Sequence, residues 1–170
     1  MKYSTPLKSL LLTLIVVFHC SALWAVELGD KAPDFTLISN DGGSISLSKF
    51  AGKVVYLDVW ASWCSTCIKS LKWMNQLQER YGSEQFQVLA VNVDENRKDA
   101  EKALAGAASK ILVAFDPQGI TPQRLNVSAM PTSFLIGRDG SLIAVHSGLD
   151  DEARKEIERQ IEMSLKSVSP

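Results

Sequence analysis

Two short stretches near the start of the chain alternate polar and apolar residues, a pattern typical of a half-buried β-hairpin. The stretches cover residues 34–37 and 44–47, and the turn-forming residues Asn40-Asp41-Gly42-Gly43 lie between them. A helical turn is predicted over residues 48–51, where Gly52 ends it. The sequence therefore predicts a hairpin and a short turn before the main body of the domain.

Two nearly continuous apolar runs come next, and each is followed by an amphipathic helical pattern. The runs cover residues 54–60 and 86–93, and their composition is typical of strands that are buried on both faces of a parallel sheet. Helical spacing extends over residues 64–81, and an alanine-rich pattern predicts a second helix over residues 97–108. This part of the chain is therefore predicted to alternate strand, helix, strand and helix.

The last third of the chain predicts a strand, a short helix, an antiparallel hairpin and a closing helix. These elements are expected at residues 111–115, 122–125, 133–145 and 150–165. The turn residues Gly137-Arg138-Asp139-Gly140 join the strands of the hairpin, and Asp150 or Asp151 is expected to cap the last helix. The whole order predicts an α/β fold with a mixed central sheet and helices on both of its faces.

The composition fits one domain of ordinary size. The chain has 170 residues, of which 46% are hydrophobic, enough for a core that needs no disulfide bonds to fold. Its formal net charge is −1 with both signs interspersed, so no electrostatic field favours nucleic acid or an acidic membrane surface. We expect no nucleic-acid partner, and recognition of other partners by shape and local chemistry.

The first 25 residues have the composition of a secretory signal peptide. Lys2 and Lys8 are the only charges in this segment, residues 10–18 are almost all apolar, and small residues follow up to Ala25. Cleavage after Ala25 is expected, which would leave residues 26–170 as a single mature domain.

An uncleaved membrane anchor is the alternative for this segment. Residues 9–26 carry no formal charge, which approaches the roughly 20 apolar residues that a membrane-spanning helix needs. His19 and the shortness of the strongly apolar run favour cleavage. Both alternatives place residues 26–170 outside the cytoplasm, and we expect them in the periplasm.

Export changes the interpretation of the cysteines. Of the three in the chain, Cys20 lies in the segment to be removed, which leaves Cys64 and Cys67. A single close pair in an exported protein is not a disulfide framework, so a redox site or a metal site is expected. A zinc site would lack ligands, because there is no second cysteine pair and both histidines lie far away in sequence. An inert disulfide over so short a loop would add little stability.

The position of the pair suits redox chemistry. Both cysteines follow a buried strand at the start of a helix, where free N–H groups and the helix dipole favour a thiolate. The i, i+3 spacing places the two sulfurs on one side of the first turn, within reach of a mutual disulfide. We expect Cys64 to be the exposed nucleophile and Cys67 the buried resolving thiol.

The segment Trp60-Ala61-Ser62-Trp63-Cys64-Ser65-Thr66-Cys67 resembles the active site of thioredoxin. The rest of residues 27–165 resembles the TlpA-like branch of exported thioredoxin relatives. The motifs of its N-terminal hairpin, central insertion and closing hairpin are matched by Gly29-Asp30-Lys31-Ala32-Pro33-Asp34-Phe35, by Asn92-Val93-Asp94-Glu95 with Phe115-Asp116-Pro117, and by Met130-Pro131-Thr132-Ser133-Phe134-Leu135-Ile136. This resemblance implies a thioredoxin-like fold, a redox-active Cys64–Cys67 disulfide and thiol-disulfide oxidoreductase activity.

The resemblance also assigns roles to residues outside the pair. Pro131 matches the family's cis-proline, which packs beside the dithiol and leaves the Met130 backbone free to pair with an extended substrate. Asp58 matches the buried acid of thioredoxin. Its pKa should be raised within an apolar strand, which suits it to accept a proton from Cys67. Trp63 is expected to form a surface that faces the partner.

Three departures from the family pattern bear on redox strength. Ala90 stands where thioredoxin has the lysine that accompanies its buried acid, so Asp58 is expected to lack a charged neighbour. Ser70 stands where many relatives have glutamate. The family usually has a proline between the two cysteines, and here Ser65-Thr66 takes the place of that dipeptide. Since no cation lies between the cysteines, we predict a lowered but not extreme pKa for Cys64.

The leading interpretation is an enzyme that exchanges thiols and disulfides with protein substrates. Reduction is the favoured direction, because the resembled family mostly reduces, and a reductase would need a membrane electron donor. We expect no cofactor, no bound metal and a monomer. Maturation of cytochromes or metalloproteins is a candidate process, although the Gly-Val-x-Gly-x-Pro-Glu pattern of the cytochrome c-maturation branch is absent.

Two other functions would use the same cysteines. A peroxiredoxin has a similar N-terminal half, but it carries threonine three residues before its reactive cysteine, where this chain has Ala61. A copper chaperone would use Cys64 and Cys67 as soft ligands, with His146 as a third ligand if the fold brought it near. Peroxide turnover and copper titration would separate these alternatives from thiol-disulfide exchange.

Overall fold

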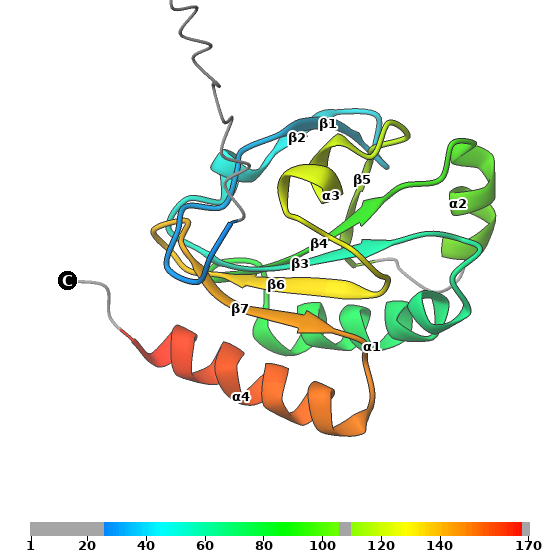
Figure 1. The fold of residues 1–170 in the computed structure, drawn as a ribbon. Helices are drawn as coiled ribbons and strands as arrows, with labels where there is room; N and C mark the ends of the chain where they lie inside the picture. Colours follow the sequence, from blue (N-terminus) through cyan, green and yellow to red (C-terminus); the bar gives the residue numbers. More distant parts are fainter. Residues whose placement is uncertain (1–25, 106–109, 168–170) are drawn as a thin grey trace, which may run out of the picture.

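The structure is a computed structural model that describes residues 26–105 and 110–167 (Figure 1). The predicted export segment, residues 1–25, lies outside the described residues. In chain order, the strands and helices are β1 Thr36–Ser39, β2 Ser44–Ser46, β3 Val54–Trp60, α1 Ser65–Tyr81, β4 Phe86–Asn92, α2 Arg97–Leu104, β5 Leu112–Phe115, α3 Ile120–Arg124, β6 Thr132–Ile136, β7 Leu142–Ser147 and α4 Asp151–Lys166. A 3-10 turn at Leu47–Phe50 precedes β3.

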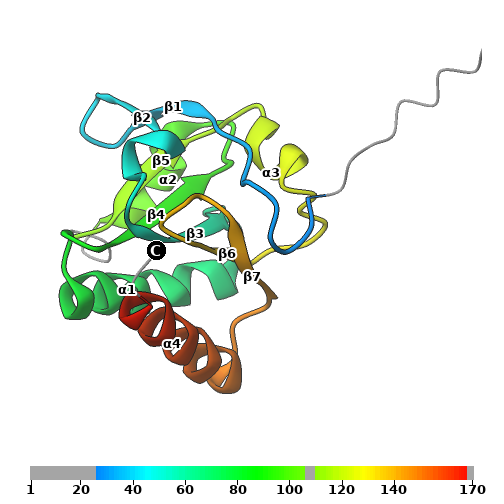
Figure 2. The ribbon, with the colours of Figure 1, turned by 90° about the vertical axis from the view of Figure 1, so that its left-hand side faces the viewer.

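The strands form one mixed sheet in the order β2-β1-β5-β4-β3-β6-β7. Strands β3, β4 and β5 are parallel, whereas β6 and β7 and the N-terminal hairpin join them in antiparallel pairs. Helices α1 and α4 lie side by side on one face, and α3 lies on the other (Figures 1 and 2). The predicted mixed sheet with helices on both faces is confirmed.

Side chains of β3 alternate between two core clusters. Tyr56 and Trp60 enter the cluster that contains the buried residues of α1 and α4, and Leu57 and Val59 enter the cluster on the opposite face. Asp58 lies between Leu57 and Val59, so it shares the face that α1 and α4 cover. This alternation places an acid in the apolar layer that also contains the cysteines.

Two helices differ from their predicted boundaries. The helix expected over residues 97–108 ends at Leu104, and residues 106–109 lie outside the described ranges. Helix α3 begins at Ile120, two residues before its predicted start. The Asp116 carboxylate accepts the backbone N–H groups of Ile120 and Thr121 at 3.2 and 2.6 Å, and this side-chain cap supports the earlier start.

Within residues 26–105 and 110–167, none of the helices combines the length and the apolar character that crossing a bilayer requires.

Candidate active site

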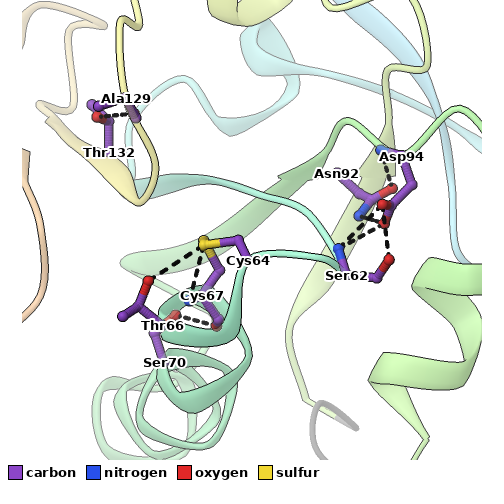
Figure 3. Close-up of a disulfide and its surroundings, with 9 residues drawn as sticks. All are labelled: Ser62, Cys64, Thr66, Cys67, Ser70, Asn92, Asp94, Ala129 and Thr132. Atoms are coloured by element: carbon purple, nitrogen blue, oxygen red, sulfur yellow. Dashed lines mark hydrogen bonds between the residues drawn. A yellow bond between two sulfur atoms is a disulfide. The ribbon is translucent and has the colours of Figure 1, made fainter.

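The cysteine pair lies where β3 passes into α1 (Figure 3). Cys64 is the N-cap residue of α1, and its sulfur forms a disulfide with Cys67, with a Cα–Cα distance of 5.2 Å. The Cys67 backbone N–H donates to Cys64 Sγ at 3.3 Å. Thr66 Oγ1 lies 3.4 Å from the same sulfur, and the hydroxyl is the donor because a disulfide sulfur carries no proton. Two donors therefore face the atom that becomes a thiolate on reduction.

The two cysteines differ in exposure. Cys64 keeps 8% of its surface exposed, whereas Cys67 has none. Ser70 is fully buried one turn further along α1 and donates its hydroxyl to the Cys67 carbonyl at 2.6 Å. Both cysteines are thus largely buried, so Cys64 is less exposed than predicted, but it is the more accessible of the two.

Replacing Thr66 with valine is expected to raise the pKa of the reduced Cys64 thiol by about half a unit to one unit. A hydrogen bond to a charged group contributes roughly 1.5 kcal/mol, and one pKa unit corresponds to about 1.4 kcal/mol. With the hydroxyl present, this pKa is expected below about 8.5. The ultraviolet absorbance of the thiolate, measured against pH, gives both values.

Ser65→Ala is the matched control for this measurement. Ser65 is exposed in the same dipeptide, and among the described residues its hydroxyl makes no hydrogen bond to Cys64 Sγ. An equal shift in both variants, or a wild-type pKa above about 8.5, would contradict the assigned role of the Thr66 hydroxyl.

A polar network from the neighbouring strand holds the loop before the cysteines (Figure 3). Asp94, which follows β4, accepts both the backbone N–H and the hydroxyl of Ser62 at 2.9 Å. Asn92 Nδ2 donates to the same carboxylate at 2.7 Å. Sequence reasoning missed these positioning residues, although two polar residues at the end of a buried strand were a visible signal. They meet Ser62 because the carboxyl ends of adjacent parallel strands lie at the same edge of the sheet.

Asp58 is a buried acid without a polar partner. It is 1% exposed, and neither carboxyl oxygen has a hydrogen-bond partner in the part of the chain that the structure describes. Ala90 stands beside it in the parallel register of β4, so the neighbouring position supplies no charge. Burial raises the pKa of Asp58 from 3.8 to about 8. The carboxyl is therefore mostly protonated at neutral pH.

Met130 and Trp63 line one groove, whereas Pro131, which follows Met130, is buried. The Met130–Pro131 peptide bond is cis, and the Thr132 hydroxyl donates to the Ala129 carbonyl at 2.7 Å across this turn (Figure 3). Trp63 is 70% exposed. It lines a groove of about 400 Å³ together with Met130, and the other walls include Val59, Val93, Pro122 and Val127. Trp63, which directly precedes Cys64 in the chain, therefore shares one mainly apolar surface with Met130.

A family model described as Redoxin matches residues 27–161. The chain belongs to the Redoxin family. Among curated members, it is 34% identical to thiol-disulfide oxidoreductase ResA of Bacillus thuringiensis over 145 residues, which cover 85% of this chain and 80% of the relative. It is 30% identical to ResA of Bacillus subtilis over 129 residues, with coverage of 76% and 72%.

Solved structures agree with this assignment. A crystal structure from Chlorobium tepidum, named as thiol:disulfide interchange protein DsbE, matches with 47% identity and a TM-score of 0.79 over 83% of this chain and 99% of that one. The exposed lipoprotein thioredoxin of Streptococcus pneumoniae matches with 29% identity and a TM-score of 0.68 over 77% and 99%. This Redoxin family member is therefore a thiol-disulfide oxidoreductase with a thioredoxin-like fold, and the predicted TlpA-like resemblance is confirmed.

His146, the suggested third copper ligand, takes part in a different contact. It lies on β7, where its Nε2 is 2.9 Å from Gln160 Oε1 of α4. Across the described ranges, no group of three or more His, Cys, Asp and Glu side chains is placed to hold a metal ion. The copper-chaperone alternative thus gains no ligand set from the fold of this Redoxin family member.

Proposed function

We propose that this oxidoreductase reduces disulfides in exported proteins and acts in the periplasm. The basic head, apolar run and small residues of positions 1–25 support export. One observation supports reduction. Among the described residues, Cys64 Sγ receives hydrogen bonds from the Cys67 N–H and the Thr66 hydroxyl and from no cationic side chain. A thiolate with so little stabilisation favours the disulfide form, so the dithiol is a good electron donor.

The proposed reaction begins at Cys64. Its thiolate attacks a partner disulfide, forms a mixed disulfide and releases one partner thiolate. Cys67 then gives its proton to the Asp58 carboxylate, and the Cys67 thiolate attacks the Cys64 sulfur. The second partner thiolate leaves, and the Cys64–Cys67 disulfide forms. Two electrons have passed to the partner, and a membrane electron donor must return them.

The turn at Met130 suits an extended substrate. Neither its N–H nor its C=O makes a hydrogen bond to another backbone group in residues 26–105 and 110–167, so both are available to a substrate strand. Substrates that fit are exported apoproteins whose cysteine pairs must be dithiols before haem or a metal is attached.

The reduction potential of the Cys64–Cys67 couple tests the proposed direction. We expect a value near that of thioredoxin, about −270 mV, because few groups stabilise the Cys64 thiolate. Thr66→Val should make the couple more reducing, since it removes one of those groups. A potential near about −120 mV, characteristic of strong protein oxidants, would overturn the reductase proposal.

Replacing Trp63 with alanine is expected to lower kcat/KM for a protein disulfide about tenfold. An exposed aromatic side chain that a partner covers often contributes between about 1 and 2 kcal/mol to binding. The rate with a small disulfide should change much less, because a small molecule does not cover the groove. Ile143→Ala is the control, since Ile143 is an exposed apolar residue on β7. Equal losses with both substrates would show that Trp63 acts on Cys64 instead.

A further inference from the structure

A row of polar side chains crosses three neighbouring strands on the face that α1 and α4 cover. Asp58 on β3 pairs in register with Ser133 on β6, and Ser133 pairs with His146 on β7. Opposite residues of antiparallel strands point to the same face, with Cβ atoms roughly 5 Å apart. Asp58 and Ser133 are 1% and 2% exposed, and His146 is partly exposed. The row therefore leads from the buried acid toward the surface.

The buried end of this row contains polar atoms without partners. Both Asp58 carboxyl oxygens, the Ser133 hydroxyl and the Tyr56 hydroxyl have no hydrogen-bond partner among the residues described. Buried polar atoms in native proteins are almost always satisfied by protein groups or ordered water. At a Cβ separation of roughly 5 Å, a rotated hydroxyl or one water molecule can join Ser133 to Asp58. The row thus has the spacing of a proton-conducting chain.

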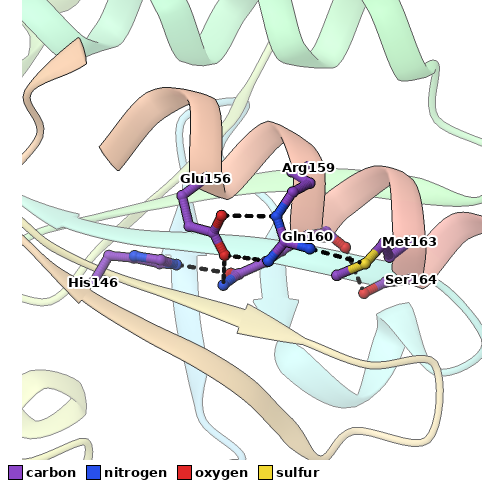
Figure 4. A network of polar contacts seen from close by, with 6 residues as sticks. All are labelled: His146, Glu156, Arg159, Gln160, Met163 and Ser164. Atoms are coloured by element: carbon purple, nitrogen blue, oxygen red, sulfur yellow. Dashed lines mark hydrogen bonds and ion pairs between the residues drawn. The ribbon is translucent and has the colours of Figure 1, made fainter. Parts of the chain in front are cut away.

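At the outer end of the row, His146 on β7 contacts Gln160 on α4 (Figure 4). Gln160 Nε2 donates to the Glu156 carboxylate at 2.7 Å, so the Gln160 amide oxygen is the atom that faces His146. His146 Nε2 must then carry the proton in this 2.9 Å hydrogen bond. In the neutral ring, Nδ1 is left with its lone pair and lies nearer the strand backbone. His146 can therefore accept a proton from the side of Ser133.

We propose that Ser133 and His146 carry protons between the buried Asp58 carboxyl and solvent. The inference rests on the proposed role of Asp58 as the acceptor for the Cys67 proton. In each cycle, neutral Asp58 releases its proton through the Ser133 hydroxyl to His146 Nδ1, and the imidazolium releases a proton to water. Asp58 returns to a carboxylate, so charge and protons balance. Asp58 is 1% exposed on the face that α1 and α4 cover, so its proton needs a route to solvent.

The charged groups around the route are compatible with this direction. Glu156 on α4 is held as a carboxylate, since Arg159 lowers its pKa, and it attracts an imidazolium at His146. Tyr56 stays neutral because burial, and then the charge of Asp58, raise its pKa well above the usual value. The Ser133 hydroxyl and then Arg154 on α4 lie near enough to Tyr56 to oppose that rise in its pKa. A proton that moves outward from Asp58 to His146 therefore moves toward the negative charge of Glu156 on α4.

Single-turnover reaction of the reduced protein with one equivalent of Ellman's reagent tests the route. The first release of thionitrobenzoate reports attack by Cys64, and the second reports attack by Cys67. At about pH 7, below the Asp58 pKa of about 8, most molecules must lose the Asp58 proton before Cys67 reacts. His146→Gln and Ser133→Ala should each slow the second release about tenfold and leave the first unchanged.

Imidazole separates proton transfer from a structural role. His146→Ala should also slow the second release, and added imidazole should restore it, whereas Ser133→Ala should not respond. Val145→Ala is the matched control, because Val145 precedes His146 on β7, points to the opposite face and is 44% exposed. It should keep both wild-type rates.

Three results would overturn the route. If Asp58→Asn leaves the second release at the wild-type rate, the role of Asp58 fails and the route fails with it. If Asp58→Asn slows the second release but His146→Gln and Ser133→Ala do not, the route alone fails. Slowing of both releases in His146→Ala, or no recovery with imidazole, would mean that His146 acts only through packing.

Discussion

Replacing Cys64 with serine is expected to reduce the turnover of protein disulfides to the uncatalysed rate, a loss of at least about a thousandfold. The serine hydroxyl stays protonated at neutral pH and cannot replace the thiolate that thiol-disulfide exchange requires. Turnover with a disulfide-bonded protein substrate measures this loss.

Cys67→Ala is the companion variant, and its expected result is different in kind. Cys64 should still attack, but no thiol would displace the partner, so a mixed disulfide on Cys64 should accumulate. Non-reducing mass spectrometry detects this adduct. The assigned roles would be reversed by the opposite pattern of adducts. In that case the Cys64→Ser variant would carry the partner on Cys67, and the Cys67→Ala variant would carry no partner on Cys64.

Replacing Asp58 with asparagine is expected to produce the largest change in stability, and the change should depend on pH. Burial raises the pKa of the folded carboxyl to about 8 from 3.8, so the folded state binds one more proton than the unfolded state between those values. Wild-type stability must therefore fall as pH rises through this window. The free energy of unfolding of Asp58→Asn relative to wild type should increase by roughly 4 kcal/mol from about pH 4 to about pH 7.

Urea unfolding at several pH values measures this difference, and Asp139→Asn is its control. Asp139 is exposed, and its hydrogen bond with Lys31 lowers its pKa. Its contribution to the pH dependence of the unfolding free energy therefore has the opposite sign to that of Asp58, and it is small because the pair is exposed. A difference between Asp58→Asn and wild type that stays constant from about pH 4 to about pH 8 would contradict the raised pKa of Asp58.

Parts of the fold were predictable because local patterns determine them. Strand β3 has the predicted boundaries, since an unbroken apolar run leaves no ambiguity, and α1 ends where Gly82 takes a positive φ of 69°. The helix after β4 is shorter than predicted because alanine propensity is only a weak guide to where tertiary packing ends a helix. The start of α3 depends on the Asp116 side chain, whose cap could not be read from spacing alone.

Some features of the candidate site could likewise be predicted from local sequence, and others could not. The cysteine spacing and the buried acid could be recognised locally. The contact between Asp94 and Ser62 and the row from Asp58 through Ser133 to His146 could not, because they depend on strand register between distant segments. Nothing in the linear sequence links Ser133 with His146, and they become neighbours only when β6 pairs with β7.

The dipeptide between the cysteines is a replaceable module for protein engineering. Ser65 and Thr66 are exposed, whereas Cys67 is fully buried and the loop before Cys64 is held by hydrogen bonds to Asp94. Side chains at positions 65 and 66 can therefore be varied without removing a buried contact of the scaffold. A library at these two positions should yield a graded series of electron donors and acceptors on a single framework of nearly constant stability.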